Sequence, residues 1–237
     1  MSLSCVITAL DFAKASEALA FAETVDPTLS RVKVGKELFT RAGPQVVKDL
    51  HTMGFEVFLD LKFHDIPNTV AGAVRAACEL GVWMVNVHAS GGKPMLEAAV
   101  EAVKTTGGDT LLIGVTVLTS MNDEDVAGVG YSNKAADQAV LLAKLAAQSG
   151  LDGVVCSPQE VPIIRGAVDS LATNFVTVTP GVRLGVLNSN DDQRRTMTPA
   201  EAVRNGSDYL VIGRPITQAA SPNDTLTSII QDTRNAA

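Results

Sequence analysis

Short apolar runs alternate along the chain with stretches in which apolar residues recur every three or four positions. The runs are rich in β-favouring residues and predict strands at residues 5–10, 31–35, 55–61, 82–87, 111–118, 153–156, 175–179 and 209–213. Helical spacing between them is clearest at Leu38, Ala42, Val46 and Leu50, at Met95, Ala99 and Val103, and at Ala136, Val140, Ala143 and Ala147. Because the runs are almost continuously apolar, they are typical of parallel strands that are covered on both faces.

Eight strands that alternate with helices within 237 residues predict one α/β domain over residues 1–237, a (β/α)8 or TIM barrel. Helix ends are marked by Gly54, Gly81, Gly150 and Gly206, each of which suits a left-handed cap. The segment Thr-Pro-Ala-Glu at residues 198–201 predicts a helix start. An open doubly wound sheet is the alternative fold, but no G-x-G-x-x-G follows the first strand.

Composition narrows the class of ligand and the cellular compartment. A net charge of −7 argues against a general nucleic-acid binder, whereas an anionic small molecule needs only a local group of positive side chains. Cys5, Cys78 and Cys156 lack metal-ligand spacing, so we expect free thiols in a reducing compartment. The first residues show no signal-peptide pattern, and the longest apolar run, 111–118, is far short of the ~20 residues that span a bilayer. We therefore expect a cytoplasmic protein without a membrane partner.

The most informative stretch is Phe-Leu-Asp-Leu-Lys-Phe-His-Asp-Ile-Pro-Asn-Thr at residues 58–69. It begins as a buried strand and then places Asp60, Lys62 and Asp65 where the strand gives way to a loop and a helix. If the strand continues through Lys62, then Asp60 and Lys62 point to the same side. An ammonium between carboxylates keeps its proton and can deliver it to a developing carbanion. A surface ion-pair cluster is the alternative interpretation, but this position favours a functional site.

Polar side chains follow nearly every predicted strand. In a (β/α)8 barrel the chemistry lies at the carboxyl ends of the strands, and phosphate often binds at the loops after the last two strands. The candidates at this rim are Asp11, Lys33, Asp60, Lys62, Asp65, His88, Thr119, Ser120, Pro180, Arg183, Gly213 and Arg214. Polar residues at a single strand end are common, but so many on one rim predict an active site.

These residues resemble the orotidine 5'-phosphate decarboxylase family. The motifs that carry the resemblance are Ala-Leu-Asp at Asp11, Lys-Val-Gly-Lys-Glu at Lys33, the block 60–69, Val-Thr-Val-Leu-Thr-Ser at Thr119, Thr-Pro-Gly at Pro180, Asp-Gln-Arg-Arg at Gln193 and Val-Ile-Gly-Arg-Pro at Arg214. The wider superfamily of sugar-phosphate decarboxylases and aldolases shares only the D-x-K-x-x-D core. The resemblance implies a homodimeric barrel, a carboxy-lyase that converts orotidine 5'-monophosphate to UMP and CO2 in the last step of de novo UMP biosynthesis, without metal or organic cofactor.

The implied reaction leaves a carbanion at C6 of the pyrimidine with no adjacent carbonyl to delocalise it. A site without a cofactor must then supply a preorganised cation and a proton donor. The resemblance implies Lys62 for both tasks, with Asp60 beside the scissile carboxylate. It also places Lys33 and Asp65 in the charged network, and Asp65 would reach into the site of the partner subunit.

Binding roles follow from the same resemblance. We expect substrate contacts from Asp11, Lys33, Asp60, Thr69, Thr119, Ser120, Pro180, Arg183, Gln193, Gly213 and Arg214. Asp11 and Lys33 would hold ribose hydroxyls, Thr119 or Ser120 the pyrimidine edge, and Arg214 the phosphate. Residues 181–195 would form a mobile lid over the phosphate that excludes water when it closes.

Two other functions stay open. A metal-dependent lyase that acts on a β-keto or hexulose phosphate would use the same D-x-K-x-x-D with Mg²⁺ on the carboxylates. A non-catalytic nucleotide-binding barrel would keep the pocket without turnover. Three histidines in separate elements form no evident metal cluster, and we expect His64 and His88 to pack or to support the rim. Lys36 is expected to be a first-turn helix residue.

Overall fold

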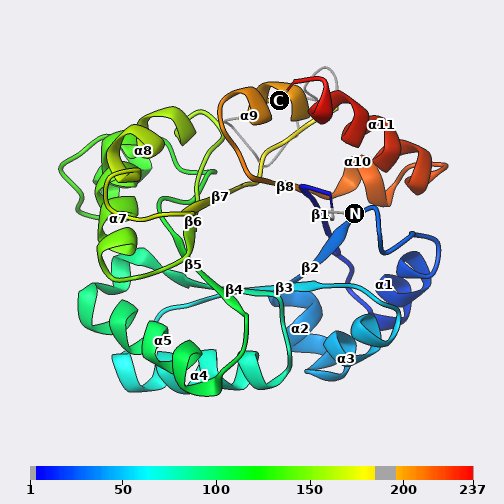
Figure 1. Cartoon of the computed structure of the whole chain (residues 1–237), viewed down its shortest axis with the longest axis horizontal. Helices are drawn as coiled ribbons and strands as arrows, with labels where there is room; N and C mark the ends of the chain where they lie inside the picture. The colour runs from blue at the N-terminus through cyan, green and yellow to red at the C-terminus, as the bar shows by residue number, and fades with distance from the viewer. Residues whose placement is uncertain (1–3, 185–195, 237) are drawn as a thin grey trace.

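The structure of the chain is a computed structural model that describes residues 4–184 and 196–236. Its parallel strands close into a barrel in which each strand pairs with its neighbours in sequence and β8 pairs with β1 (Figure 1). The strands are β1 (Val6–Ala9), β2 (Arg31–Gly35), β3 (Val57–Phe63), β4 (Met84–His88), β5 (Leu111–Val115), β6 (Gly153–Val155), β7 (Val176–Thr179) and β8 (Tyr209–Ile212). This order confirms the predicted (β/α)8 barrel.

Helices follow the strands and surround the barrel (Figure 1). They are α1 (Ala15–Ala22), α2 (Lys36–Ala42), α3 (Gln45–Thr52), α4 (Pro67–Glu79), α5 (Lys93–Thr106), α6 (Asp123–Gly128), α7 (Ala135–Gln148), α8 (Val161–Val168), α9 (Pro199–Arg204), α10 (Arg214–Thr217) and α11 (Pro222–Arg234), with a 3-10 turn η1 (Ala89–Gly91). Within the described parts of the chain, none of the helices has the length and apolar character that crossing a membrane requires.

The helix-end signals that were read from the sequence are confirmed. Thr198 caps α9: its hydroxyl accepts the Glu201 N–H at 3.3 Å while the Glu201 carboxylate accepts the Thr198 N–H at 2.9 Å. The four glycines that follow predicted helices, at positions 54, 81, 150 and 206, all have φ between +76° and +95°. A glycine takes this conformation without the steric cost that a Cβ brings.

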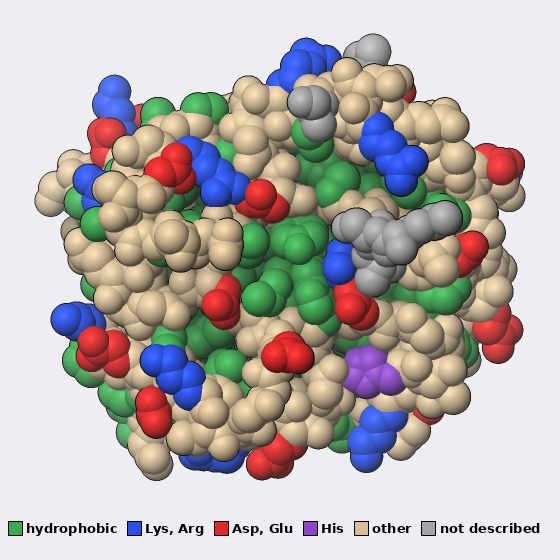
Figure 2. All heavy atoms as spheres, viewed as in Figure 1, with side chains coloured by type: hydrophobic (Ala, Val, Ile, Leu, Met, Phe, Trp, Pro, Cys, Tyr) green, Lys and Arg blue, Asp and Glu red, His purple; other side chains and the backbone are tan. Residues whose placement is uncertain are grey.

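Apolar side chains fill two regions of core. The larger lies between the barrel and its helices and is built mostly of Val, Leu, Ile and Ala, as the low aromatic content requires. The smaller fills the barrel with Ile7, Phe58, Met84, Ile113 and Val178, each at most 1% exposed. Viewed along the barrel axis, hydrophobic side chains gather at the centre and charged side chains surround them (Figure 2). Because the interior is packed, ligands can bind only at an end of the barrel.

The fifth strand is shorter than its apolar run predicted. It ends at Val115 rather than at residue 118, because its neighbour β6 ends at Val155. The Val155 carbonyl accepts both the backbone N–H and the hydroxyl of Thr116, at 3.2 and 2.9 Å. The chain then turns, and the Leu118 carbonyl accepts the Met121 N–H at 2.9 Å. Thr116 and Val117 are buried as hydrophobicity predicted, but Leu118 is 39% exposed, and the loss of the pairing partner was not predictable from hydrophobicity.

One predicted helical pattern is divided in two. The four-residue spacing from Leu38 to Leu50 suggested continuous helix, but α2 ends at Ala42 and α3 begins at Gln45. Gly43 has a φ of +66°, and Pro44 follows it. Proline at this point removes a helical N–H and disfavours helix in the residue before it, so the break follows from these two residues.

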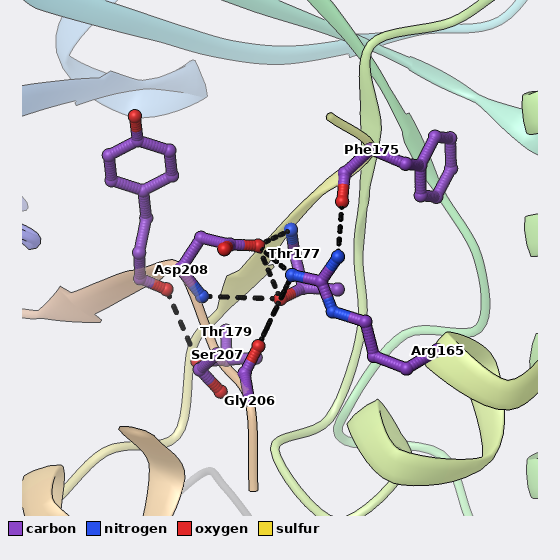
Figure 3. A network of polar contacts seen from close by, with 8 residues as sticks. Arg165, Phe175, Thr177, Thr179, Gly206, Ser207 and Asp208 are labelled. Carbon is purple, nitrogen blue, oxygen red and sulfur yellow. Dashed lines mark hydrogen bonds and ion pairs between the residues drawn. The ribbon is translucent and has the colours of Figure 1, made fainter. Parts of the chain in front are cut away.

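A network at the amino ends of β7 and β8 ties both strands to α8 (Figure 3). The Asp208 carboxylate accepts the backbone N–H of Thr177 at 2.6 Å and its hydroxyl at 3.0 Å, and it also binds the Arg165 guanidinium. Arg165 in turn donates to the carbonyls of Phe175, at 2.6 Å, and Gly206, at 3.3 Å. These contacts hold β7 and β8 in register at the barrel end opposite the carboxyl ends of the strands.

We expect Asp208→Ala to lower the free energy of unfolding by about 1–2 kcal/mol, since it removes an acceptor of several hydrogen bonds from a site that is only partly exposed. Urea unfolding at pH 7 measures the change. The matched control is Glu37→Ala, which breaks an i,i+4 pair with Arg41 whose side chains are 62% and 61% exposed. That control should cost less than about 0.5 kcal/mol. Equal losses in the two variants would contradict a special role for the network.

Candidate active site

A cavity of about 310 Å³ opens at the carboxyl ends of the strands. Its apolar part is formed by the barrel interior and includes Ala9, Phe58, Val115, Val155 and Val211. The sequence-predicted residues that line the cavity are Asp11, Lys33, Asp60, Lys62, Thr119, Ser120, Pro180, Arg183, Gly213 and Arg214. Residues from six strand ends thus meet in one place, as the barrel fold predicted, with an apolar floor below them.

Charges of alternating sign form a row across the cavity. Lys33 Nζ lies 3.2 Å from Asp11 Oδ1 and 3.4 Å from Asp60 Oδ2, and Lys62 Nζ lies 2.5 Å from Asp60 Oδ1. The side chains of Lys33 and Asp60 are only 10% and 12% exposed, whereas that of Asp11 is 69% exposed. Asp60 therefore stands at the centre of the row with one ammonium on each carboxylate oxygen.

The two buried members of the row, Asp60 and Lys33, hold their charges through the neutral pH range. Burial raises the pKa of Asp60, but the ammoniums of Lys33 and Lys62 outweigh burial and set that pKa below its ordinary value of 3.8. Burial likewise lowers the pKa of Lys33, but Asp60 and Asp11 outweigh it and set that pKa above 10.5. Each buried charge is thus retained because its neighbour carries the opposite sign.

The backbone at Lys62 is strained. Its φ is +53°, in the left-handed region that residues other than glycine seldom occupy. The pairing of β3 with β4 shifts register between Leu59 and Phe63, which marks a bulge. Lys62 therefore reaches Asp60 from a kinked strand that runs to Phe63, and not by the regular alternation expected from the sequence. A left-handed residue costs roughly 1–2 kcal/mol, and such strain gathers at functional sites.

Asn86 on β4 is part of this arrangement; the sequence indicated it as a polar residue at the end of the fourth strand but gave it no role. Its side chain is fully buried. Its carboxamide oxygen accepts the Lys62 backbone N–H at 2.8 Å, and its nitrogen donates to Asp60 Oδ1 at 2.7 Å. The available signal was the amide in Met-Val-Asn-Val, a polar residue with apolar neighbours in a predicted strand, since a buried amide needs partners.

Two guanidiniums, those of Arg183 and Arg214, line the cavity at the loops after β7 and β8. Backbone pairing places the first: the Arg183 N–H donates to the Met197 carbonyl at 2.9 Å, and the Met197 N–H donates to the Gly181 carbonyl at 3.3 Å. Arg214 begins α10 directly after β8 and Gly213. Guanidiniums match the geometry of phosphate oxygens, and these loops are where barrels of this kind hold phosphate.

Two of the sequence-predicted residues are not brought into this cavity. Asp65 and Thr69 are exposed and do not line it; the Asp65 carboxylate accepts the Ile66 N–H at 2.7 Å. Gln193 lies outside the described residues, as does most of the segment predicted to be a lid. The roles of these residues stay predictions.

His64 and His88 lie beside the row without lining the cavity, with ring centroids 5.3 Å apart. Burial, with a further contribution from His64, lowers the pKa of His88 to about 4. In the unfolded chain the pKa of histidine is about 6.5, so the unfolded chain binds more protons between these values. His88 therefore stabilises the fold less and less as pH falls from about 6.5 toward 4.

We expect His88→Gln to weaken this loss. Between pH 7 and pH 5 the wild type should lose about 1–2 kcal/mol more unfolding free energy than the variant, after allowance for the partial exposure of His88. Urea unfolding at both pH values in both proteins gives the difference. His51, whose pKa burial also lowers, is present in both proteins and cancels. Identical pH dependence would show that His88 does not titrate as stated.

In the described part of the chain, His, Cys, Asp and Glu side chains nowhere gather in threes as a metal-ligand group. The central carboxylate of the cavity, Asp60, is surrounded by donors instead: the ammoniums of Lys33 and Lys62 and the amide of Asn86. These groups neutralise a carboxylate in the way that a bound cation otherwise would.

A (β/α)8 barrel with a row of carboxylates and ammoniums and two arginines around one cavity, over an apolar floor, is typical of barrel enzymes that act on small anionic substrates. Residues 4–229 match the sequence model of the orotidine 5'-phosphate decarboxylase / HUMPS family. The chain belongs to this family.

Individual relatives agree with the family match. A Sodalis glossinidius protein named orotidine 5'-phosphate decarboxylase is 59% identical over 230 residues, which cover 97% of this chain and 90% of that protein. A Neisseria meningitidis serogroup C protein of the same name is 57% identical over 217 residues, covering 92% and 87%. The crystal structure of orotidine 5'-phosphate decarboxylase from Lactobacillus acidophilus has a TM-score of 0.84 at 36% identity and covers 97% of this chain and 99% of that one.

Proposed function

We propose that this chain decarboxylates orotidine 5'-monophosphate to UMP and CO2, the last step of UMP synthesis. The observation that carries the proposal is the contact of Lys62 Nζ with Asp60 Oδ1, 2.5 Å long, at the edge of an apolar cavity in a chain of this family. The names of relatives at 57% and 59% identity support the same reaction.

The chemistry assigns a task to each of three members of the row, Lys62, Asp60 and Lys33. The bond between C6 and the carboxylate carbon breaks, CO2 leaves, and the electron pair stays on C6. The Lys62 ammonium stabilises this developing charge and then donates a proton to C6, which yields UMP and a neutral amine that regains a proton from water. Asp60 holds the ammonium in position, and Lys33 keeps Asp60 ionised.

In this proposal the substrate extends across the cavity, and its phosphate, ribose and pyrimidine each face a different group of residues. We assign the phosphate to Arg214, with Arg183, Pro180, Gly213 and, from outside the described residues, Gln193, because two guanidiniums provide the needed charge. Asp11 and Lys33 would then face the ribose hydroxyls from the strand ends, while Thr119 or Ser120 would face the pyrimidine edge. The reaction needs no metal or organic cofactor in this scheme.

The proposed activity is tested by mixing orotidine 5'-monophosphate with purified protein in excess EDTA. The ultraviolet absorbance of the substrate is followed over time. Loss of the substrate band with UMP as product supports the proposal and its independence of metal. If turnover occurs only for a keto-sugar phosphate after Mg²⁺ is added, the chain is a metal-dependent lyase instead. If UMP binds tightly and neither substrate reacts, the chain is a nucleotide-binding barrel.

We further propose that the enzyme is a homodimer in which Asp65 and Thr69 complete the site of the partner. Both residues are exposed at the rim, and between them Ile66 is 67% exposed, which is unusual for a large apolar side chain. Burial of Ile66 in a symmetric interface would carry Asp65 toward the second subunit. We also place the enzyme in the cytoplasm, since its three cysteines are free thiols.

Mixing two inactive variants tests the shared site. Lys62→Ala and Asp65→Ala should each be inactive alone, but random exchange of subunits regenerates native sites to about a quarter of the total. Each variant mixed with itself is the control. No recovery after exchange, or sedimentation as a 24.8 kDa monomer at micromolar concentration with and without UMP, would overturn the shared site.

A further inference from the structure

Asn86 joins two parts of the reactive centre through one neutral side chain. Its oxygen accepts the Lys62 backbone N–H at 2.8 Å, and its nitrogen donates to Asp60 Oδ1 at 2.7 Å. That same oxygen of Asp60 accepts the Lys62 ammonium at 2.5 Å. The amide therefore holds the backbone of the lysine and the carboxylate that the tip of the lysine binds.

The bulge in β3 explains why a side chain is needed here. Parallel strands satisfy each other's N–H groups with backbone carbonyls, but the pairing of β3 with β4 shifts between Leu59 and Phe63. The Lys62 N–H, on a residue with a φ of +53°, is bonded instead to the Asn86 side chain. A strained conformation persists where the surroundings over-determine it, and Asn86 supplies that constraint from a fully buried position.

The requirements of the position select an amide. The group must donate to a carboxylate and accept from an N–H within one planar head, and it must be neutral. A leucine of similar volume would leave the Lys62 N–H and a lone pair of Asp60 without these bonds. An ionised aspartate could accept from Lys62 but would repel Asp60.

We propose that Asn86 is a positioning residue for the decarboxylation, one that sets the Lys62 ammonium and Asp60 Oδ1 in their reactive geometry without touching substrate. The inference rests on the proposed function. It predicts that loss of the amide lowers kcat far more than it weakens nucleotide binding, because the groups that line the phosphate and ribose ends of the cavity are left in place.

Three variants test this inference against wild type. Asn86→Leu should lower kcat by roughly 10–100-fold, since small misplacements of reacting groups have effects of this size. The Kd for UMP should change by less than about threefold, because Asn86 is not among the residues that line the cavity. The matched control is Thr110→Val, which removes one buried hydrogen bond, to the Val82 carbonyl at 2.8 Å, before β5 at the opposite end of the barrel. Its kcat should stay within about twofold of wild type.

Asn86→Asp gives a pH signature that general loss of packing would not produce. A protonated acid can replace the amide, since its O–H donates to Asp60 and its carbonyl accepts from Lys62. An ionised acid cannot donate. Asp60 and Lys62 on β3, Lys33 behind Asp60, and His88 and His64 at the rim are the charged or titratable groups that face the position. The ratio of variant to wild-type kcat should fall as pH rises, and a ratio that does not change with pH would count against the inference.

Amide hydrogen exchange at Lys62 separates this inference from the proposed function. Exchange should be slow in wild type and at least tenfold faster in Asn86→Leu, with or without substrate. If wild type fails to convert orotidine 5'-monophosphate, the proposed function falls while exchange still reports on the contact. If wild type is active and Asn86→Leu, folded by its melting temperature, keeps wild-type kcat, or Asn86→Asp keeps it at pH 8, the inference is overturned.

Discussion

Lys62→Ala is expected to lower kcat/KM for orotidine 5'-monophosphate by roughly four to seven orders of magnitude. Two contributions are lost together. A positioned general acid contributes about 10²–10⁴-fold, and a preorganised charge on the developing anion contributes about 10²–10³-fold. Lys62 Nζ is held 2.5 Å from Asp60 Oδ1, so neither solvent nor a distant lysine replaces it at the same place.

Progress curves of ultraviolet absorbance with high enzyme concentrations measure so large a loss. The matched control is Lys36→Ala. Lys36 is exposed at the start of α2, three residues beyond Lys33, and does not line the cavity. Its removal should leave kcat/KM within about threefold of wild type. A folded Lys62→Ala variant with more than a few percent of wild-type activity would reject Lys62 as the proton donor.

The Lys62→Ala variant also tests how the interaction energy of Lys62 is divided between the ground state and the transition state. Removal of Lys62 leaves the central carboxylate with a single ammonium, that of Lys33, 3.4 Å away. UMP carries no carboxylate at C6, so Asp60 does not repel it. We therefore expect UMP affinity to fall far less than turnover, which would place the contribution of Lys62 in the transition state rather than in ground-state binding.

The fold was predictable because the hydrophobic pattern of the sequence and the alternation of strands and helices both indicate a (β/α)8 barrel. Apolar runs at the strand positions and glycines such as Gly81 and Gly150 after helices gave the order of elements. In a parallel barrel all carboxyl ends face one way, so Asp11, Lys33 and Arg214 had to meet. Their convergence is a consequence of topology and not of their spacing in the chain.

The details that could not be predicted depend on local pairing between strands. Nothing in the residue types around Lys62 announces a left-handed φ, since lysine has no preference for it. The bulge exists only when β3 lies beside β4, and the same pairing brings Asn86 to Lys62 and Asp60. A hydrophobic run likewise cannot reveal that β5 loses its partner at Val155.

A second large loss of activity is expected from a substitution at the phosphate end of the cavity. Arg214→Ala should lower kcat/KM for orotidine 5'-monophosphate by about 10²–10⁴-fold, because charge-assisted hydrogen bonds to phosphate contribute about 1.5–3 kcal/mol each and a guanidinium can form two. Part of this loss should appear in kcat, since energy from binding a remote phosphate organises the groups at the reacting carbon. Steady-state kinetics of the variant and of wild type give the division between kcat and KM.

Added phosphite separates the effect of Arg214 on phosphate binding from its effect on the organisation of the groups at the reacting carbon. With a substrate that lacks the phosphate, wild type should react slowly and added phosphite should accelerate it, because the dianion occupies the place beside Arg214 and Arg183. In Arg214→Ala the acceleration by phosphite should be much weaker, and guanidinium ions added to solution should restore part of it by filling the space that the side chain left. Arg204→Ala is the matched control, since Arg204 lies in α9 and does not line the cavity. If phosphite accelerates Arg214→Ala as strongly as it does wild type, the dianion is held elsewhere and Arg214 has another task. If the acceleration is lost in Arg214→Ala and kept in Arg204→Ala, Arg214 holds the dianion, and the energy of phosphate binding helps to organise the groups at the reacting carbon.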